Sequence, residues 1–188
     1  MKKEIYGGAG IALALIVILA AFGTFYKVDA GEYAVVKRVG NVVGTYGPGL
    51  HMKIPFFDDA VMVDGKVQTV SFTGEERLSG ASKDLQDVWI QANVNYFVNP
   101  QSIEKIVTTY GETYRERVVT PVLINSIKAT SAQYTAEELV TKRADFNSRV
   151  AENIKATLAQ NDMIFKESSI VDIAYSPEFT KAIEEKVT

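Results

Sequence analysis

Residues 88–98 read VWIQANVNYFV, and this stretch decides the fold class. Gln91, Asn93 and Asn95 stand between apolar neighbours, and apolar side chains recur at every second position: Val88, Ile90, Ala92, Val94, Tyr96 and Val98. Alternation with period two is typical of a strand in a sheet that has one buried and one solvated face. The sequence therefore predicts a half-covered sheet, and the covering elements should lie nearby in the chain.

Helices follow this strand. Asn99 and Pro100 suit the N-cap and first position of a helix, and Gly111 suits its end; its apolar face would be Ile103, Ile106, Val107 and Tyr110. A second helix is expected over residues 112–130, although Pro121 should kink or break it. A third begins with TAEE at residues 135–138, a capping box, and carries a stripe of Leu139, Phe146, Val150, Ile154 and Leu158. Residues 164–175 read as a final strand.

Shorter strands are expected before the central one. Candidates are residues 31–39, 42–43, 61–63 and 67–72, whereas glycine and proline predict irregular structure over 44–49, and residues 75–87 read as polar loop. The fold class is therefore α+β. We expect a β-rich lobe over residues 28–75 and an α/β lobe over residues 76–175.

The C-terminal residues predict a new helix over 176–188. Ser176, Pro177 and Glu178 suit its N-cap and first turn, and Phe179 and Ile183 lie four apart among charged residues. This one-sided pattern is typical of the start of a coiled coil, or of an end that docks on a partner.

The N-terminal residues predict a membrane anchor over 1–27. Residues 5–26 carry no charge, and a helix of this length reaches roughly 33 Å, enough to cross a hydrocarbon core. The alternative is a cleaved signal peptide, but the apolar run is long and Phe22, Phe25 and Tyr26 replace small residues near its end. Lys2 and Lys3 on one side of a single-pass anchor nearly balance Lys27, Lys37 and Arg38 on the other. The denser charge at the N-terminus favours a cytoplasmic N-terminus with the body on the opposite side.

Composition excludes several function classes. The chain has 188 residues, a net charge of −3 with mixed signs, no cysteine and one histidine, His51. Nucleic-acid binding, disulfides and thiolate chemistry are thus not expected, and neither is a cofactor or a metal.

No catalytic residue is expected. His51 has no nucleophile or carboxylate of a recognisable motif near it, and Ser79 with Lys83 lacks the context of a serine-lysine enzyme. Asp84 and three acidic pairs (residues 58–59, 75–76 and 137–138) fit solvated or capping roles.

One loop suits contact with lipid. Its apolar residues are Leu50, Met52, Ile54, Pro55, Phe56 and Phe57, about two dozen positions after the anchor. The same residues would equally suit a buried core, and the sequence leaves both readings open.

Several motifs together resemble one family. Residues 28–40 read VDAGEYAVVKRVG and 47–58 read GPGLHMKIPFFD; they are followed in order by SKDLQDV at 82–88, YTAEEL at 134–139 with Arg143, and VDIAYSPEF at 171–179 with AIE at 182–184. The combination resembles the SPFH (band-seven) family of stomatins, prohibitins, flotillins and the HflK/HflC pair, and is most similar to the prohibitin and HflC branches.

The resemblance implies a scaffold and not an enzyme. Members of this family form membrane-bound rings or cages with other SPFH subunits, organise a membrane microdomain and often regulate a membrane AAA protease. Two alternatives remain: a stomatin-like regulator of a channel without a ring, and a membrane-anchored hydrolase. The chain ends before the long coiled coil and C-terminal cap that the resemblance implies.

Subunit contacts are expected on the third and last helices. Across neighbouring copies, the acids Glu137, Glu138, Asp145 and Glu152 would face the bases Lys142, Arg143, Arg149 and Lys155, with Phe179 and Ile183 added from the last helix. Each exposed pair contributes little, but a ring repeats it many times.

Overall fold

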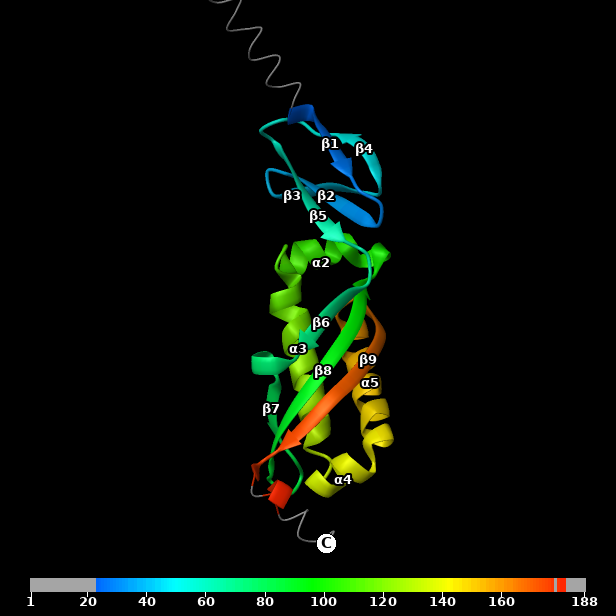
Figure 1. The fold of residues 1–188 in the computed structure, drawn as a ribbon. Coiled ribbons are helices and arrows are strands. Elements are labelled where there is room, and N and C mark those ends of the chain that lie inside the picture. The colour runs from blue at the N-terminus through cyan, green and yellow to red at the C-terminus, as the bar shows by residue number, and fades with distance from the viewer. Residues whose placement is uncertain (1–22, 178, 182–188) are drawn as a thin grey trace, which may run out of the picture. The chain divides into compact units, whose positions relative to one another are not determined.

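The computed structural model describes residues 23–177 and 179–181, and these form two compact units (Figure 1). Up to residue 65 the chain belongs to the first unit, to which residues 103–112 return. The second unit holds residues 66–102 and the chain from 113 onward. The described residues thus combine strands and helices, as the sequence predicted for an α+β protein.

The first unit is built from five short strands. A two-stranded sheet pairs β1 (Phe25–Val28) with β4 (Gly49–Met52). A three-stranded antiparallel sheet has β2 (Glu32–Arg38) between β3 (Asn41–Tyr46) and β5 (Asp58–Asp64). The helix α2 (Ile103–Tyr110) packs on β2 and β3. Apolar side chains from the strands and from α2 form its core: Val28, Ala34, Val35, Val36, Val61, Val63, Ile103, Ile106 and Val107.

The second unit is organised around one long strand, β8 (Asp87–Val98). β9 (Met163–Tyr175) pairs along one edge of β8. β6 (Gln68–Phe72) and β7 (Leu78–Ala81) pair with successive parts of the other edge, separated by a 3-10 turn at Gly74–Glu76. Every strand pair is antiparallel. The predicted central strand is therefore confirmed.

Helices cover one face of this sheet. α3 (Thr120–Ser131) contacts β7, α5 (Arg143–Gln160) contacts β9, and the two helices contact each other (Figure 1). All six alternating apolar residues of β8 are completely buried, whereas the residues between them keep partial exposure. The stripe of Phe146, Val150, Ile154 and Leu158 is also completely buried. The period-two and helical patterns therefore meet in one core.

Two helix predictions need correction. The backbone stays helical from a π-helical turn (Arg115–Val119) into α3, and Pro121 directly follows that turn. The expected disturbance at the proline therefore takes the form of a π-helical turn and not of a break in the helix. The third predicted helix is two helices, α4 (Ala136–Thr141) and α5, separated at Lys142 with φ −113° and ψ 34°. Leu139 and Phe146 are both buried on their own sides of this break, so core packing sets the direction of each helix.

Two loop predictions were also partly wrong. Residues 44–46 continue β3 and Gly49 begins β4, although we expected irregular structure over 44–49. The expected polar loop over 75–87 contains β7, whose Ser79 and Gly80 pair with Trp89 and Val88. Backbone hydrogen bonds to a neighbouring strand form these elements, and such bonds leave little trace in the side-chain pattern.

The predicted lobe boundary at residue 75 also differs from the structure. β6 ends at Phe72 but pairs with β8, so the first unit ends at Gly65. The helix α2, expected in the α/β lobe, packs in the first unit.

The predicted membrane anchor lies mostly outside the described residues, which begin at residue 23. None of the helices in the described ranges is long and apolar enough to span a membrane. Phe25 and Tyr26, which we placed in the apolar helix, instead begin β1, because their backbone pairs with Met52 and His51.

At the other end, Ser176 caps a helical turn as expected: its hydroxyl accepts from the Phe179 N–H at 3.3 Å. Ile183 lies outside the described residues.

Candidate functional site

The apolar loop lies beside the point where the described chain begins. β4 leads into the loop and pairs with β1, so Met52 stands opposite Phe25. The Lys53 N–H donates to the Thr24 carbonyl at 2.7 Å. Pro55 lies against Gly23, since a Cβ built there would be 3.5 Å from the Pro55 Cβ. The loop is therefore fixed next to residues 23–25, which lie at the end of the long uncharged stretch of sequence.

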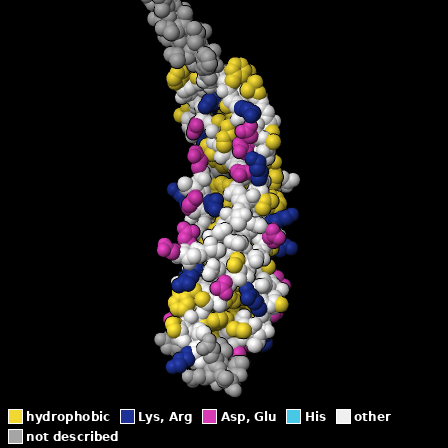
Figure 2. Space-filling view, viewed as in Figure 1, with side chains coloured by type: hydrophobic (Ala, Val, Ile, Leu, Met, Phe, Trp, Pro, Cys, Tyr) yellow, Lys and Arg dark blue, Asp and Glu magenta, His cyan; other side chains and the backbone are white. Residues whose placement is uncertain are grey.

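Large apolar side chains of this region point into solvent and not into the core. Phe56 is 93% exposed and Phe57 61%. Together with other exposed side chains they form what we call the apolar tip: Phe25, Val39, Leu50, Met52, Ile54, Phe56 and Phe57. Figure 2 shows hydrophobic side chains gathered at the end of the first unit that carries β1 and β4. Pro55 is half-buried beneath them. The described first unit thus leaves the loop uncovered.

Two tip residues are held in an unusual backbone conformation. Phe56 has φ 67° and Val39 has φ 48°, in the left-handed region that bulky side chains rarely adopt. The Val39 N–H donates to the Phe57 carbonyl at 3.2 Å, which joins the β2–β3 turn to the loop. Strain of this kind persists only where surrounding structure enforces it, and it is often found at functional sites. Sequence reasoning missed Val39, because the contact depends on chain segments 18 residues apart.

An ion pair holds the base of the loop. Asp58 is almost completely buried, and Arg38 donates to its carboxylate from Nε at 2.7 Å and from Nη2 at 3.0 Å. The same carboxylate accepts from the Ile54 N–H at 2.8 Å, while the Asp58 N–H donates to the Ile54 carbonyl. These hydrogen bonds, led by those from Arg38, lower the pKa of Asp58 to about 2. The loop is thus closed by a charged clasp that stays ionised at ordinary pH.

His51 has a structural position behind the tip. Its Nε2 lies 2.8 Å from the Gly47 carbonyl oxygen, and its ring centroid lies 5.6 Å from that of Tyr26 and 5.2 Å from that of Tyr46. Aromatic contacts at this separation are favourable. The histidine therefore fixes the β1–β4 pair.

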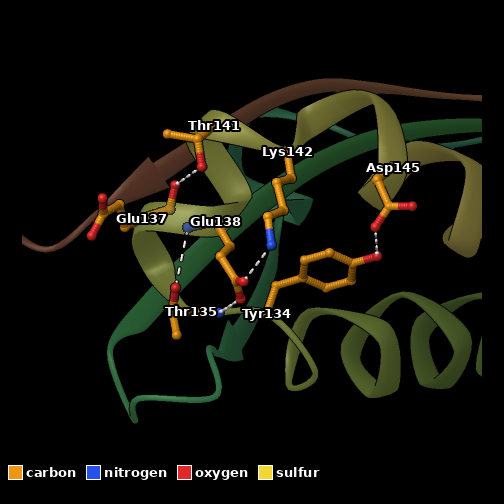
Figure 3. Close-up of polar contacts among 7 residues, drawn as sticks. All are labelled: Tyr134, Thr135, Glu137, Glu138, Thr141, Lys142 and Asp145. Atoms are coloured by element: carbon orange, nitrogen blue, oxygen red, sulfur yellow. Dashed lines mark hydrogen bonds and ion pairs between the residues drawn. The ribbon is translucent and has the colours of Figure 1, made fainter.

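The second candidate surface surrounds the start of α4 (Figure 3). Thr135 and Glu138 form the predicted capping box, with the Glu138 N–H donating to Thr135 Oγ1 and the Thr135 N–H donating to Glu138 Oε2. Lys142 donates to Glu138 at 2.8 Å. Lys142 and the Thr135 N–H together hold the pKa of Glu138 below its usual range. The charges of Glu138 and Lys142 thus pair with each other, one helical turn apart in the same chain.

Other predicted interface charges also have partners inside the chain. Tyr134 donates to Asp145, and Arg149 pairs with Glu152 at 3.4 Å (Figure 3 shows the first contact). Arg143 donates to the Ile170 and Val171 carbonyls at 3.1 and 3.0 Å. Among the charged residues that were predicted at the subunit interface, only the side chains of Glu137 and Lys155 make no hydrogen bond or ion pair to the described residues.

Arg143 therefore stabilises β9 where its register with β8 shifts, between positions 170 and 172. Phe179 contacts Tyr175 with ring centroids 5.4 Å apart. The structure brings Glu138, Lys142, Asp145 and Arg143 to adjoining turns of α4 and α5, and it leaves Phe179 at the end of β9.

The residues considered for catalysis have structural contacts. Ser82 donates to Asp84 at 2.6 Å, and Asp84 accepts from the Ala136 N–H at 2.9 Å. The hydrogen bond from Ser82, joined by that from Ala136, lowers the pKa of Asp84. Ser79 lies in β7, whereas His51 belongs to the first unit. Within the described ranges, no group of three or more histidine or acidic side chains is arranged to hold a metal ion.

Comparisons with known proteins give one consistent result. The family model described as SPFH domain / Band 7 family matches residues 26–188. Prohibitin-2 of Colletotrichum higginsianum is 33% identical over 95% of this chain and 58% of its own length. Prohibitin-6, mitochondrial, of Arabidopsis thaliana is 32% identical over 96% of this chain and 63% of its own. Prohibitin-2 of Schizosaccharomyces pombe is 30% identical over 99% and 65%. The chain thus spans 58–65% of the length of these relatives.

Proposed function

The chain belongs to the SPFH domain / Band 7 family, and we propose that it is a subunit of a membrane-anchored scaffold. The observation that carries this proposal is the exposed apolar tip beside residues 23–25. A protein in water gains nothing from seven large apolar side chains gathered at one end, whereas a lipid surface would cover them.

The anchor in this proposal is residues 5–24. β1 begins at Phe25, so the uncharged stretch available for a helix is shorter than the sequence alone suggested. About 20 apolar residues span a hydrocarbon core, and residues 5–24 just meet that length. An anchor that ends here would leave Thr24, and the loop bonded to it through Lys53, at the membrane surface. The geometry of the first unit would then bring the tip onto the same leaflet.

Insertion of the tip would add to the anchor's affinity for membrane. Burying two phenylalanine side chains contributes roughly 3–6 kcal/mol on the usual side-chain scale. Because Arg38 and Asp58 close the loop, little conformational entropy would be lost when it inserts. We keep the orientation suggested by Lys2 and Lys3, with a cytoplasmic N-terminus and the SPFH body on the opposite side.

We further propose assembly into a ring or cage with identical or related SPFH subunits. The support is the similarity to prohibitins and the exposed charged faces of α4 and α5. Since the structure uses most of those charges within the chain, Glu137 and Lys155 are the best candidates for pairing across copies. Such a ring would organise a membrane microdomain, and a membrane AAA protease is the client class we propose. No catalytic residue has a role in this account.

Vesicle flotation tests the membrane part of the proposal. A chain lacking residues 1–22 should keep partial association with lipid vesicles, and Phe56→Ser with Phe57→Ser should remove it. A matched control is Val67→Ser with Val171→Ser, since those apolar side chains are about half exposed in the second unit. If the shortened chain with both phenylalanines stays entirely in the aqueous fraction, the tip does not bind lipid.

Particle mass tests the scaffold part. The full chain in mild detergent should give a particle of many subunits at low salt. A monomer or dimer at every concentration would contradict a ring and favour the alternative of a small stomatin-like regulator.

A further inference from the structure

A third strained and exposed apolar side chain lies far from the tip in sequence. Leu85, in the loop between β7 and β8, is 85% exposed and has φ 61°. Of the four non-glycine residues with positive φ in the described chain, Val39, Phe56 and Leu85 are apolar and more than three-quarters exposed. The left-handed region is unfavourable for leucine, so the loop and not the residue's own preference holds it there.

The loop that carries Leu85 is rigidly attached to the second unit. Ser82 accepts from the Gln86 N–H at its Oγ and from the Leu85 N–H at its carbonyl, both at 3.0 Å. The Lys83 N–H donates to the Tyr134 carbonyl at 2.7 Å, and Asp84 accepts from the Ala136 N–H. A leucine presented in one fixed conformation loses little entropy when a partner covers it.

A small cavity lies on the same unit, between α4 and the end of β9; the Leu85 loop meets the start of the same helix, where the Ala136 N–H donates to Asp84. The volume of the cavity is about 180 Å³, and its lining is Leu139, Val140, Arg143, Ile173 and Tyr175. Cavities of about 150 Å³ already accept a benzene-sized group, so a leucine side chain fits. Leu85 does not fill this cavity in its own chain, because it is exposed.

The charges beside the two features match. Lys83 and Asp87 flank Leu85 and are exposed. Arg143 lines the cavity, and the exposed Asp172 precedes the lining residue Ile173 and acts electrostatically on Tyr175. One cation and one anion on each side allow Lys83 to face Asp172 and Asp87 to face Arg143. Arg143 already donates to β9 carbonyls, which leaves its position fixed and its charge in place.

We propose that Leu85 of one copy inserts into the α4–β9 cavity of the next copy. This inference rests on the proposed scaffold function and specifies its subunit contact. The projecting side chain and its cavity are different parts of one surface, so the contact is heterologous and can continue from copy to copy until a ring closes. Because most charges on α4 and α5 have partners inside the chain, apolar insertion would supply most of the subunit contact, and pairing of Glu137 with Lys155 would add to it.

Cysteine cross-linking tests the contact. Because the 188-residue sequence contains no cysteine, every disulfide must come from the introduced residues. In membranes containing the full chain, Leu85→Cys with Val140→Cys should give a ladder of disulfide-linked dimers, trimers and larger species on mild oxidation. An equal mixture of the two single variants should stop at the dimer. The control pair is Leu85→Cys with Lys166→Cys, both exposed, and we expect at least tenfold less cross-linking.

Leu85→Asn provides a second measurement that does not depend on cross-linking. Asparagine tolerates the left-handed region, so the fold should keep its thermal midpoint, but the particle should lose mass at concentrations where the wild-type chain is assembled. The charge pair Lys83→Glu with Asp172→Lys should assemble better than either single change.

The outcomes separate this inference from the proposed function. If the wild-type particle is large but the Leu85–Val140 pair cross-links no better than the control, or only within one chain, the contact is wrong and the scaffold stands. The same holds if Leu85→Asn leaves particle mass unchanged. If the wild-type chain is monomeric at all concentrations, both are wrong.

Discussion

Arg38 and Asp58 face each other across β2 and β5, and their side chains form a two-point ion pair that closes the apolar loop. The Asp58 carboxylate also accepts a hydrogen bond from the Ile54 N–H. This one side chain of β5 therefore bonds both to β2 and to the apolar loop. The clasp explains how Phe56 can be held in solvent with φ 67° instead of folding back onto the unit.

The stability of the first unit should depend on pH through Asp58. Its pKa is lowered from 3.8 to about 2 in the folded state, so its contribution is fully present above pH 4. That contribution should be lost as pH falls from about 4 through about 2, where the folded carboxylate takes up a proton. Urea midpoints measured between pH 2 and pH 6 check this.

The matched variant is Asp58→Asn, which keeps shape and removes charge. It should be less stable than wild type at pH 6, and the two midpoints should converge at pH 2. Equal pH dependence in both proteins would mean that Asp58 is not the responsible group.

Loss of the capping box should destabilise the second unit. Thr135→Ala removes the acceptor for the Glu138 N–H, and such caps contribute about 0.5–2 kcal/mol. Thr135→Ser should retain most of that free energy. Chemical denaturation measures the difference, and identical stability of the alanine and serine variants would argue against the cap.

Arg143 and Lys155 should behave differently although both were predicted at the subunit surface. Arg143→Ala removes hydrogen bonds to two β9 carbonyls and should lower the free energy of unfolding by about 1–2 kcal/mol. Lys155→Glu should change it by less than about 0.5 kcal/mol, because this side chain is exposed. At low salt the same variant should reduce particle mass, and Glu137→Lys with Lys155→Glu should restore it. An unfolding deficit in Lys155→Glu would contradict this division.

Substitutions of the residues once considered for catalysis should act through structure alone. Asp84→Ala should lower stability, because Ala136 loses its acceptor, whereas Ser79→Ala should be silent. His51→Ala should loosen the β1–β4 pair. Assays of assembly and of membrane binding, read beside the thermal midpoint, check this. A variant that abolished turnover of a substrate while fold and particle persisted would refute the non-enzymatic account.

Much of the second unit follows from sequence pattern. The alternation in β8, the stripe on α5 and the capping box at Thr135 are local features whose side chains report their own burial, and the structure confirms each. The elements that the sequence did not predict depend on other segments of the chain. β7 forms a strand because its backbone hydrogen-bonds to β8, and β1 forms a strand because its backbone pairs with β4.

The candidate site shows the same division. The apolar loop was identified by composition, but its exposure could not be, since the same residues would suit a core. Val39 belongs to the apolar tip only because its backbone contacts Phe57, which the sequence does not reveal. The charges of α4 and α5 were predicted to pair with other subunits, because partners such as the β9 carbonyls of Ile170 and Val171 are far away in sequence.

The most direct test of the central claim is the depth of residue 56 in a membrane. The chain has one tryptophan, Trp89, so Trp89→Phe with Phe56→Trp places a single fluorophore at the tip of the full-length protein. In vesicles containing lipids brominated on their acyl chains, its fluorescence should be strongly quenched, whereas a tryptophan at position 85 on the Trp89→Phe background should be unaffected. Equal, weak quenching at both positions would contradict the account, because it would place the apolar tip in water.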